Sequence, residues 1–449
     1  MVGKIEKNPQ LSIFKTPLVQ FIDLEHPMCV LANKIDWDSV EDDFRGYYKD
    51  FGRPSIPIRK MVGLTMLKHL KNLSDESLAA GWKENPYWQY FCGEVNFQVT
   101  GPFDPSEFVH FRKRIGEEGA EKILKLSILL FGKEAVENEV LIDTTVQEKN
   151  ITFPTDTKLQ KKIINKVVKI AKDEGIRLRQ TYTRTLPQLV IEQRQRNHPK
   201  RRKKANAAAR KIKTIAGRVL RDIENKMNAE QKAYYSKDLE LFKRVLAQER
   251  HTPNKIYSLH EPHVKCIAKG KDAKQYEFGN KSSIVKTRTS GIILGAIAFR
   301  DNLFDGDTLP AQLEQVERLA GYRPRIAIAD RGYRGRPQVN DTKIVTPKPL
   351  PKSATKYQRY KTRKMFRSRA GIEPVIGHIK HDHRMLRNFL KGVEGDKINT
   401  LLAAAAFNLR KMLNRIVKTA GKNFGQILDE LFFHFQKIFP IQFQKKLTF

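Results

Sequence analysis

The chain has 449 residues, of which 40% are hydrophobic, and this is enough material for two or three globular domains. Its formal net charge is +35, with −4 on residues 1–150 and +39 on residues 151–449, which favours a polyanionic partner such as nucleic acid. Because the apolar runs are short and the N-terminus lacks a cleavable apolar segment, we expect no transmembrane helix and no secretion, and three cysteines without paired spacing argue against a disulfide framework and a cysteine-based zinc site.

Residues 51–115 have a helical pattern. Apolar side chains recur at three- and four-residue steps from Ile58 to His69, and Ser74 is placed to cap the next helix. We expect an all-helical N-terminal domain over residues 1–130, to which the resemblance described below assigns binding of DNA ends. Its clustered aromatic side chains either stack on bases or form the core: Trp82, Tyr87, Trp88, Tyr90 and Phe91.

A second domain, over residues 136–420, begins at a β-branched run. Residues 139–146 read as a strand that contains Asp143, and a short extended piece follows at 151–154. An acid inside such a run is costly unless it is paired or bound to a cation. Asp143 is therefore a candidate metal ligand, and the plainer alternative is that it caps a turn.

Residues of about 157–250 form a basic helical insertion in this domain. Two apolar faces repeat at helical spacing, one from Leu159 to Ile170 and one from Ile212 to Met227. Between them, residues 194–213 hold ten lysines and arginines and no acid. This run is either a direct phosphate contact or a disordered solvated tether, and its densest block is Lys200, Arg201, Arg202, Lys203 and Lys204.

Strand character returns after the insertion. We expect strands at residues 255–258, 263–268, 290–299, 326–329 and 342–345 and a helix at 309–319, which makes the domain α/β. Asp330 ends an apolar strand and is followed by Arg331 and Arg334, with which it could instead form ion pairs. The spare acids are Asp156, Asp301, Asp305 and Asp307, of which Asp305 and Asp307 in the loop-like stretch NLFDGDTL could form a turn or a substrate-side contact.

The stretch MFRSRAGIEPVIGHIK places Phe366, Arg369, Glu373 and Lys380 at offsets that keep helical phase within an arc of roughly 60°. Pro374 interrupts the pattern, so the phase is firm only from Glu373 onward. A solvated helix in which Glu373 pairs with Arg369 is the plainer alternative. The neighbouring histidines favour phosphate contacts over a zinc site, since no second ligand pair accompanies them: His378, His381 and His383.

Cleavage of a phosphodiester requires an activated nucleophile and a stabilised leaving oxygen. Two divalent cations about 4 Å apart supply both, and clustered carboxylates hold hard cations such as Mg²⁺. Asp143, Asp330 and Glu373 are the acids that could form such a cluster. The C-terminal tail, residues 421–449, is amphipathic and is expected to pack on its own chain, with a partner chain or membrane surface as the alternative.

Three stretches, LIDTTV, IAIADRGYRG and FRSRAGIEPVIGHIK, together resemble the Asp-Asp-Glu transposases of bacterial insertion sequences, of the insertion-sequence-five type. The family signature Y-x2-R-x3-E-x6-K is present with Phe366 at the tyrosine position. The resemblance implies an RNase H-like catalytic core in which Asp143, Asp330 and Glu373 bind two Mg²⁺ or Mn²⁺ ions. It also implies that Arg369 and Lys380 contact transposon-end DNA.

The function implied is metal-dependent cleavage of transposon ends, followed by transfer of the freed 3′-hydroxyl into target DNA. The expected partner is double-stranded DNA, both terminal inverted repeats and target, with further contacts from Arg331, Arg334 and the Lys200–Lys204 block. We expect a homodimer or larger assembly in the bacterial cytoplasm, associated with the nucleoid. The alternatives are a non-catalytic DNA-binding protein and an RNase H-like nuclease without strand transfer.

Overall fold

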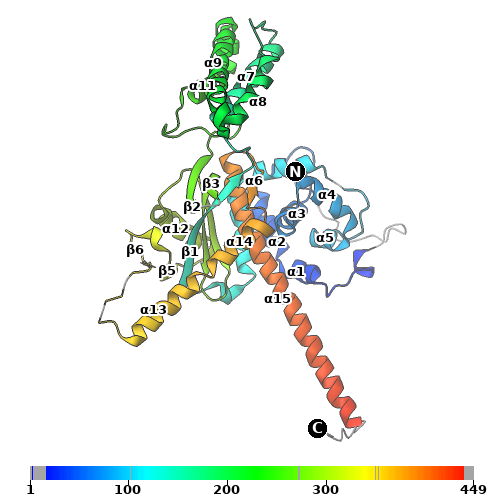
Figure 1. Cartoon of the computed structure of the whole chain (residues 1–449). Helices are drawn as coiled ribbons and strands as arrows, with labels where there is room; N and C mark the ends of the chain where they lie inside the picture. Colours follow the sequence, from blue (N-terminus) through cyan, green and yellow to red (C-terminus); the bar gives the residue numbers. More distant parts are fainter. Residues whose placement is uncertain are drawn as a thin grey trace, which may run out of the picture.

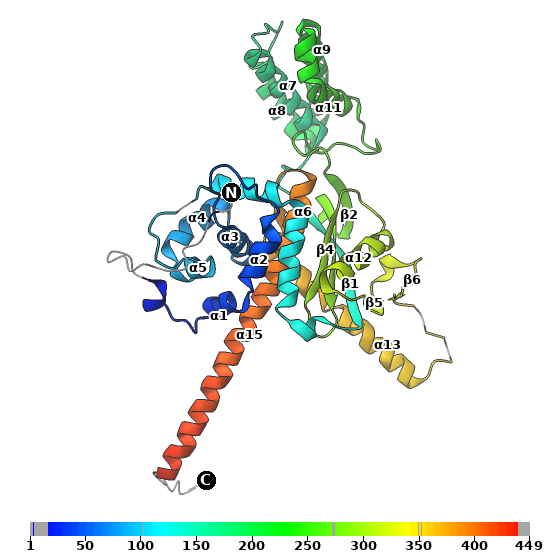
Figure 2. The same cartoon turned by 180° about the vertical axis from the view of Figure 1, so that it is seen from behind.

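The computed structural model describes residues 3, 17–101, 103–271, 274–348, 350–351 and 353–438. The N-terminal part is helical, as the apolar spacing predicts, and lies beside a mixed sheet (Figures 1 and 2). Its elements are η1 (Leu18–Gln20), α1 (Pro27–Lys34), α2 (Trp37–Arg45), α3 (Ile58–Leu70), α4 (Asp75–Glu84), α5 (Pro86–Phe91), α6 (Pro105–Leu129) and η2 (Gly132–Ala135).

Caps and a kink define the N-terminal helices. Ser74 caps α4 as predicted, its hydroxyl accepting from the Ser77 amide at 3.0 Å. Asp104 caps α6, and this helix continues past the basic residues Arg112 to Arg114 through a kink at Gly116, where φ is 57°. The aromatic cluster is core, with Trp82 and Phe91 fully buried.

One sheet joins strands that are distant in sequence. The continuous order is β2-β3-β1-β5-β7-β6, with β4 paired to β3 and β8 paired to β1; β3 runs antiparallel to β1, whereas β5 and β7 run parallel to it. The strands are β1 (Glu139–Lys149), β2 (Lys265–Lys271), β3 (Lys274–Thr287), β4 (Ile293–Phe299), β5 (Ile326–Ile328), β6 (Gln338–Val339), β7 (Thr342–Val345) and β8 (Arg387–Asn388).

The longest strand, β3, is absent from the sequence prediction, and residues 255–258, predicted as a strand, are not assigned to any. In β3 polar residues stand where an apolar strand pattern is expected, and Ser282 and Ser283 are fully buried between neighbours. Gly279 is required at the crossing with β1, because a Cβ there would lie 1.9 Å from the Gln147 carbonyl oxygen.

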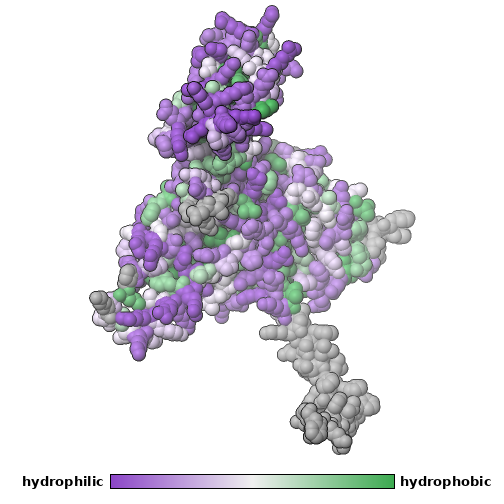
Figure 3. Space-filling view, viewed as in Figure 1, coloured by the Kyte–Doolittle hydropathy of each residue, from purple (hydrophilic) through white to green (hydrophobic). Residues whose placement is uncertain are grey.

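The basic insertion between β1 and β2 is helical and has its own hydrophobic cluster, formed by residues 159–259. It stands apart from the sheet, and hydrophilic side chains cover its surface (Figures 1 and 3). Asp156 closes its base by accepting hydrogen bonds from Gln248 at 3.1 Å and Lys255 at 2.9 Å. Its elements are α7 (Asp156–Asp173), α8 (Thr185–Arg194), η3 (Gln195–Asn197), η4 (Pro199–Arg201), α9 (Arg202–Lys226), α10 (Ala229–Tyr234) and α11 (Ser236–Ala247).

The remaining helices complete the molecule. They are η5 (Asp305–Thr308), α12 (Leu309–Ala320), η6 (Arg331–Tyr333), α13 (Lys356–Arg369), α14 (Ile372–Asp382) and α15 (Gly392–Ile438). The buried part of α15 packs against α3, α6 and β4, so the N-terminal helices and the sheet share one hydrophobic core. Of the predicted amphipathic tail, the backbone to Ile438 continues α15 and the rest lies outside the described residues. No helix in the described part is long and apolar enough to cross a membrane.

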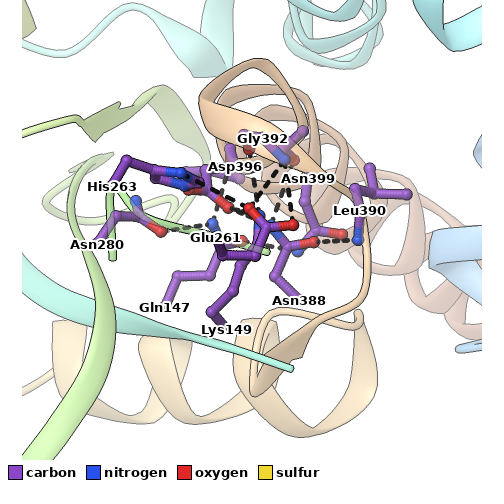
Figure 4. Close-up of polar contacts among 12 residues, drawn as sticks. Gln147, Lys149, Glu261, His263, Asn280, Asn388, Leu390, Gly392, Asp396 and Asn399 are labelled. Atoms are coloured by element: carbon purple, nitrogen blue, oxygen red, sulfur yellow. Dashed lines mark hydrogen bonds and ion pairs between the residues drawn. The ribbon is translucent and has the colours of Figure 1, made fainter. Parts of the chain in front are cut away.

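A buried polar network fastens these parts together (Figure 4). Lys149 of β1 donates to Asp396 of α15 at 2.6 Å, and His263, which precedes β2, contacts the other Asp396 oxygen at 2.9 Å. Asn388 of β8 donates to the same carboxylate at 2.6 Å, and Glu261 lies 3.5 Å from Lys149. The network therefore ties the exit of the insertion to the sheet and to α15.

Candidate functional site

Asp143 and Asp330 come together because β1 and β5 are parallel neighbours in register. Leu141 of β1 pairs with Ile328 of β5. Asp143 follows Leu141 by two residues, and Asp330 follows Ile328 by two residues. Side chains two residues apart share a face of a strand, so Asp143 points to the side on which Leu141 contacts the cluster with Ile372. Asp330 caps η6, its carboxylate accepting from the Gly332 amide at 2.7 Å.

Arg369, the last residue of α13, lies between the predicted acids. Its guanidinium is 3.4 Å from Asp143, 3.6 Å from Asp330 and 4.0 Å from Glu373. The structure thus brings all three acids close to one guanidinium group. Arg369 is also the ion partner of Asp330, a role that the sequence left open to Arg331 or Arg334.

The helical stripe is divided between two helices, so the expectation of a single helix is wrong. α13 ends at Arg369 and α14 begins at Ile372, with Glu373 in its first turn, where a negative charge is stabilised by the helix dipole. Pro374 is tolerated there because first-turn amides have no partner within the helix. Lys380 lies two turns from Glu373 on the same face, about 10 Å along the axis.

Burial is the main influence on the pKa of Asp143. It raises the pKa of Asp143 to about 6, the Arg369 guanidinium opposing this shift and the Asp330 carboxylate adding to it. Tyr333 lies fully buried beside the acids, and burial together with the charges of Asp143, Asp305 and Asp330 raises its pKa well above the ordinary value. Glu373 by contrast is 67% exposed.

Asp305 is a fourth carboxylate at this place, which the sequence left as a turn or a substrate contact. It accepts from the Thr144 hydroxyl at 2.8 Å and from Lys281 at 2.9 Å. A Cβ at Gly332 would lie 2.8 Å from Asp305 and 2.9 Å from Asp330, so both carboxylates reach the same glycine. The signal available in the sequence was the Asp-Gly-Asp turn before α12, which carries no spacing that relates it to Asp143.

These residues fit a divalent cation in their chemistry, since hard cations prefer carboxylate oxygens. Within the described residues, however, no group of three acids, histidines or cysteines is close enough to hold one. The Arg369 guanidinium lies among the carboxylates, and the largely exposed Glu373 is 4.0 Å from it. A cation held by all three acids therefore requires Arg369 to move aside.

The other predicted contacts lie at varying distances from the acids. Arg331 and Arg334 are exposed on and after η6, directly beside Asp330. Lys200 to Lys204 form η4 and the start of α9, all exposed on the separate insertion, where Lys204 pairs with Glu192 at 3.0 Å. The block is thus part of folded helices rather than a disordered tether.

The neighbouring histidines do not form one site. His378 is exposed and pairs with Asp382 at 2.7 Å, whereas His383 is buried, its ring nitrogen 3.0 Å from the His69 carbonyl oxygen. Phe366 is half-buried and packs on the cluster of Leu141, Ile328 and Ile372. Its ring thus supports α13, at the position where the resembling family has tyrosine.

Comparison with known proteins gives two family matches. Residues 16–114 match the family described as Transposase domain (DUF772), and residues 249–409 match the family described as Transposase DDE domain. A Rhizobium meliloti protein described as "Uncharacterized protein ORF8 in nfe locus" is 41% identical over 191 residues, which are 41% of this chain and 92% of that protein. No solved structure matches the chain.

Proposed function

This chain belongs to the insertion-sequence transposases with a DDE domain, and from this membership we propose that it cuts the DNA ends of its element and joins the freed 3′-hydroxyl to target DNA. The observation that carries the proposal is the convergence of Asp143, Asp330 and Glu373 on one guanidinium. Three carboxylates from a central strand, a neighbouring strand end and a helix form a set that suits phosphoryl transfer.

The proposed catalytic core is RNase H-like and spans residues 136–420. Its support is the arrangement of β4, β3, β1, β5 and β7, with β3 antiparallel and β5 and β7 parallel to the central strand. In such a sheet the first acid lies within the central strand and the second at the end of its parallel neighbour. Assignment to the insertion-sequence-five type rests on the signature around Glu373 and stays a prediction.

Transposases of the DDE family generally use divalent metal ions, and we propose two Mg²⁺ or Mn²⁺ ions. When bound, such ions activate the attacking water or 3′-hydroxyl and offset charge on the leaving oxygen. Asp143, Asp330 and Glu373 would hold them. Asp330 is oriented by its bond from the Gly332 amide, and Asp143 is shielded from bulk water by burial.

Basic residues around these acids would hold the DNA. Arg369 would exchange its acid contacts for a phosphate, and Lys380, Arg331 and Arg334 would contact the backbone on either side. The insertion block from Lys200 to Lys204 would add contacts without sequence preference. Recognition of the terminal repeats is assigned to the helical region before residue 130, and assembly of two or more copies stays a prediction.

The test is cleavage of duplexes carrying the terminal repeats that flank the gene. Asp330→Asn and Glu373→Gln each remove one carboxylate charge while keeping the side chain's size. We expect cleavage to fall at least about 100-fold, the scale on which loss of one transition-state contact is felt. The matched control is Asp341→Asn, an exposed acid in the turn between β6 and β7, which should cleave as the unaltered protein does.

Undiminished cleavage by either active-site variant would refute the assignment of the acids. Strand transfer is measured separately, as insertion of a labelled, precut 3′ end into a plasmid. A protein that cuts ends without joining them would be a nuclease, and one that binds ends without cutting them would be a DNA-binding protein alone.

A further inference from the structure

The helix α13 is strongly basic and has no buried residue. Its 14 residues include seven lysines and arginines and no acid. Tyr357 is 71% exposed and Tyr360 62% exposed, although tyrosine rings usually find apolar contacts. In Figure 1 the helix extends away from the sheet, and its last residue, Arg369, lies at the acids.

The two faces of α13 differ. At about 100° per residue, Met365, Phe366 and Arg369 lie toward one side, and these side chains are half-buried and contact the sheet and the acids. The opposite side is an outward stripe of four exposed residues spread over about 16 Å of helix within an arc of roughly 60°. These residues are Lys356, Tyr360, Arg363 and Arg367.

This outward stripe is unfavourable to the helix itself. Arg363 and Arg367 are four residues apart, and like charges at that spacing destabilise a helix by about 0.2–0.5 kcal/mol. A helix of this length with little tertiary support is marginal in water. Hydrophilic side chains dominate the surface at this place (Figure 3). A helix does not need so many charges of one sign to be soluble. A bound polyanion would neutralise these charges and so remove the repulsion between them.

The position of the stripe points to duplex DNA rather than to an acidic protein. B-DNA carries one phosphate charge per about 1.7 Å of its axis, so a 16 Å stripe faces a dense row of phosphates. Arginine, lysine and the tyrosine hydroxyl are all donors that proteins use for phosphate contacts. The stripe ends at Arg367, two residues before Arg369, which contacts the acids, so a duplex bound along it lies beside them.

We propose that the outward stripe of α13, formed by Lys356, Tyr360, Arg363 and Arg367, binds the phosphate backbone of duplex DNA beside the acid site. Its location relative to the cleaved bond rests on the proposed function; the binding itself does not. The contacts are with backbone only, so they add affinity without selecting a sequence. These phosphate contacts also stabilise α13, the helix that ends at Arg369 and so positions its guanidinium.

The test is equilibrium binding to a mixed-sequence duplex in EDTA, over a series of salt concentrations. The variant Lys356→Gln/Arg363→Gln/Arg367→Gln should reduce the slope of log K against log salt by about 2 to 3, since each phosphate contact contributes about 0.9. The control variant Lys232→Gln/Lys237→Gln/Arg244→Gln removes the same charge from exposed positions on α10 and α11. It should change the slope by less than half as much.

A conservative variant guards against a fold effect. Arg363→Lys/Arg367→Lys keeps both charges, and its slope should equal that of the unaltered protein. Equal slopes for the glutamine variant and the unaltered protein, or equal losses in the glutamine and control variants, would overturn the proposal. So would loss of self-association in sedimentation with DNA binding unchanged, which would make the stripe a protein contact. Because EDTA prevents catalysis, these results stand apart from any failure of the cleavage test.

Discussion

Arg369 lies between the three acids, where the proposed metal ions would supply positive charge. The three acids would repel one another if they were ionised without a counter-charge, and the guanidinium lies 3.4 to 4.0 Å from each of them. Its contacts are longer than a good charge-assisted hydrogen bond of about 2.8 Å. The guanidinium is thus suited to leave the acids for a phosphate when cations and DNA arrive.

The substitution Arg369→Gln tests this role. In EDTA we expect the melting temperature to fall by a few degrees, because the acids lose their counter-charge. Addition of Mg²⁺ should then raise it more than in the unaltered protein, because the cations no longer compete with a guanidinium. The measurement is thermal unfolding by circular dichroism with and without Mg²⁺. A Mg²⁺-induced rise no larger than in the unaltered protein would contradict it.

The sequence predicted that these acids lie close together, and it did not predict the contacts that each of them makes. Asp143 and Asp330 each interrupt or follow an apolar run, which is a local signal. The contact of Arg369 with both, and the proximity of Asp305, depend on how loops after β4 and α13 fold back to the sheet. No spacing in the sequence records these distances.

At the scale of elements, helix junctions decide where the functional side chains lie. The pattern from Phe366 to Lys380 keeps helical phase across the break at residues 370–371, and the sign of an interruption in the sequence, Pro374, lies three residues after that break. β3 was missed because it is central but partly polar, its polar side chains being satisfied inside the structure: Asn280 donates to Ser282 at 3.2 Å. The network around Asp396 could not be predicted either, because its members come from β1, β8, α15 and the segment before β2, which are far apart in the sequence.

His69 makes the junction of α3 with α15 sensitive to acid. It is buried, with its ring nitrogens 3.4 Å from the Thr65 carbonyl oxygen and 3.3 Å from the Asn399 side-chain oxygen. Burial, with a further contribution from Lys68, lowers its pKa from 6.5 to about 3. Between these values the unfolded chain binds the proton and the folded chain does not. Stability should therefore fall as the pH drops below 6.5.

The variant His69→Gln keeps a hydrogen-bonding side chain but cannot titrate. It should be less stable at neutral pH, because a core side chain has changed shape, and its stability should depend less on pH. The slope between about pH 4 and 6 should fall by up to about 1.4 kcal/mol per pH unit. Urea unfolding measures this slope, with His378→Gln, an exposed histidine, as the control. An unchanged slope in His69→Gln would show that other groups carry the acid sensitivity.

For the whole molecule, the insertion is a separable unit. Its hydrophobic cluster is its own, and its two ends meet where Asp156 contacts Gln248 and Lys255. The N-terminal helices are different, because they share a core with the sheet through α6 and α15. The apolar faces within the insertion predicted its helices, but the sequence did not reveal that its ends lie side by side.

Replacement of residues 157–254 by a short glycine and serine linker should leave the rest of the molecule folded. The melting temperature should change little, whereas the slope of log K against log salt for duplex DNA should fall by about 4.5 if all five cations of the block from Lys200 to Lys204 contact phosphates. Thermal unfolding and DNA titration measure the two effects. Collapse of the fold, or an unchanged salt slope, would contradict this division of roles.

The central claim is that Asp143, Asp330 and Glu373 hold the divalent cations used on DNA. The most direct measurement replaces Mg²⁺ with Fe²⁺ and maps where ascorbate-generated radicals cut the polypeptide. The account predicts cuts near residues 143, 330 and 373 that excess Mg²⁺ suppresses and that Asp330→Asn weakens. Cuts confined to other parts of the chain, or cuts at these three places that persist unchanged in Asp330→Asn, would contradict it.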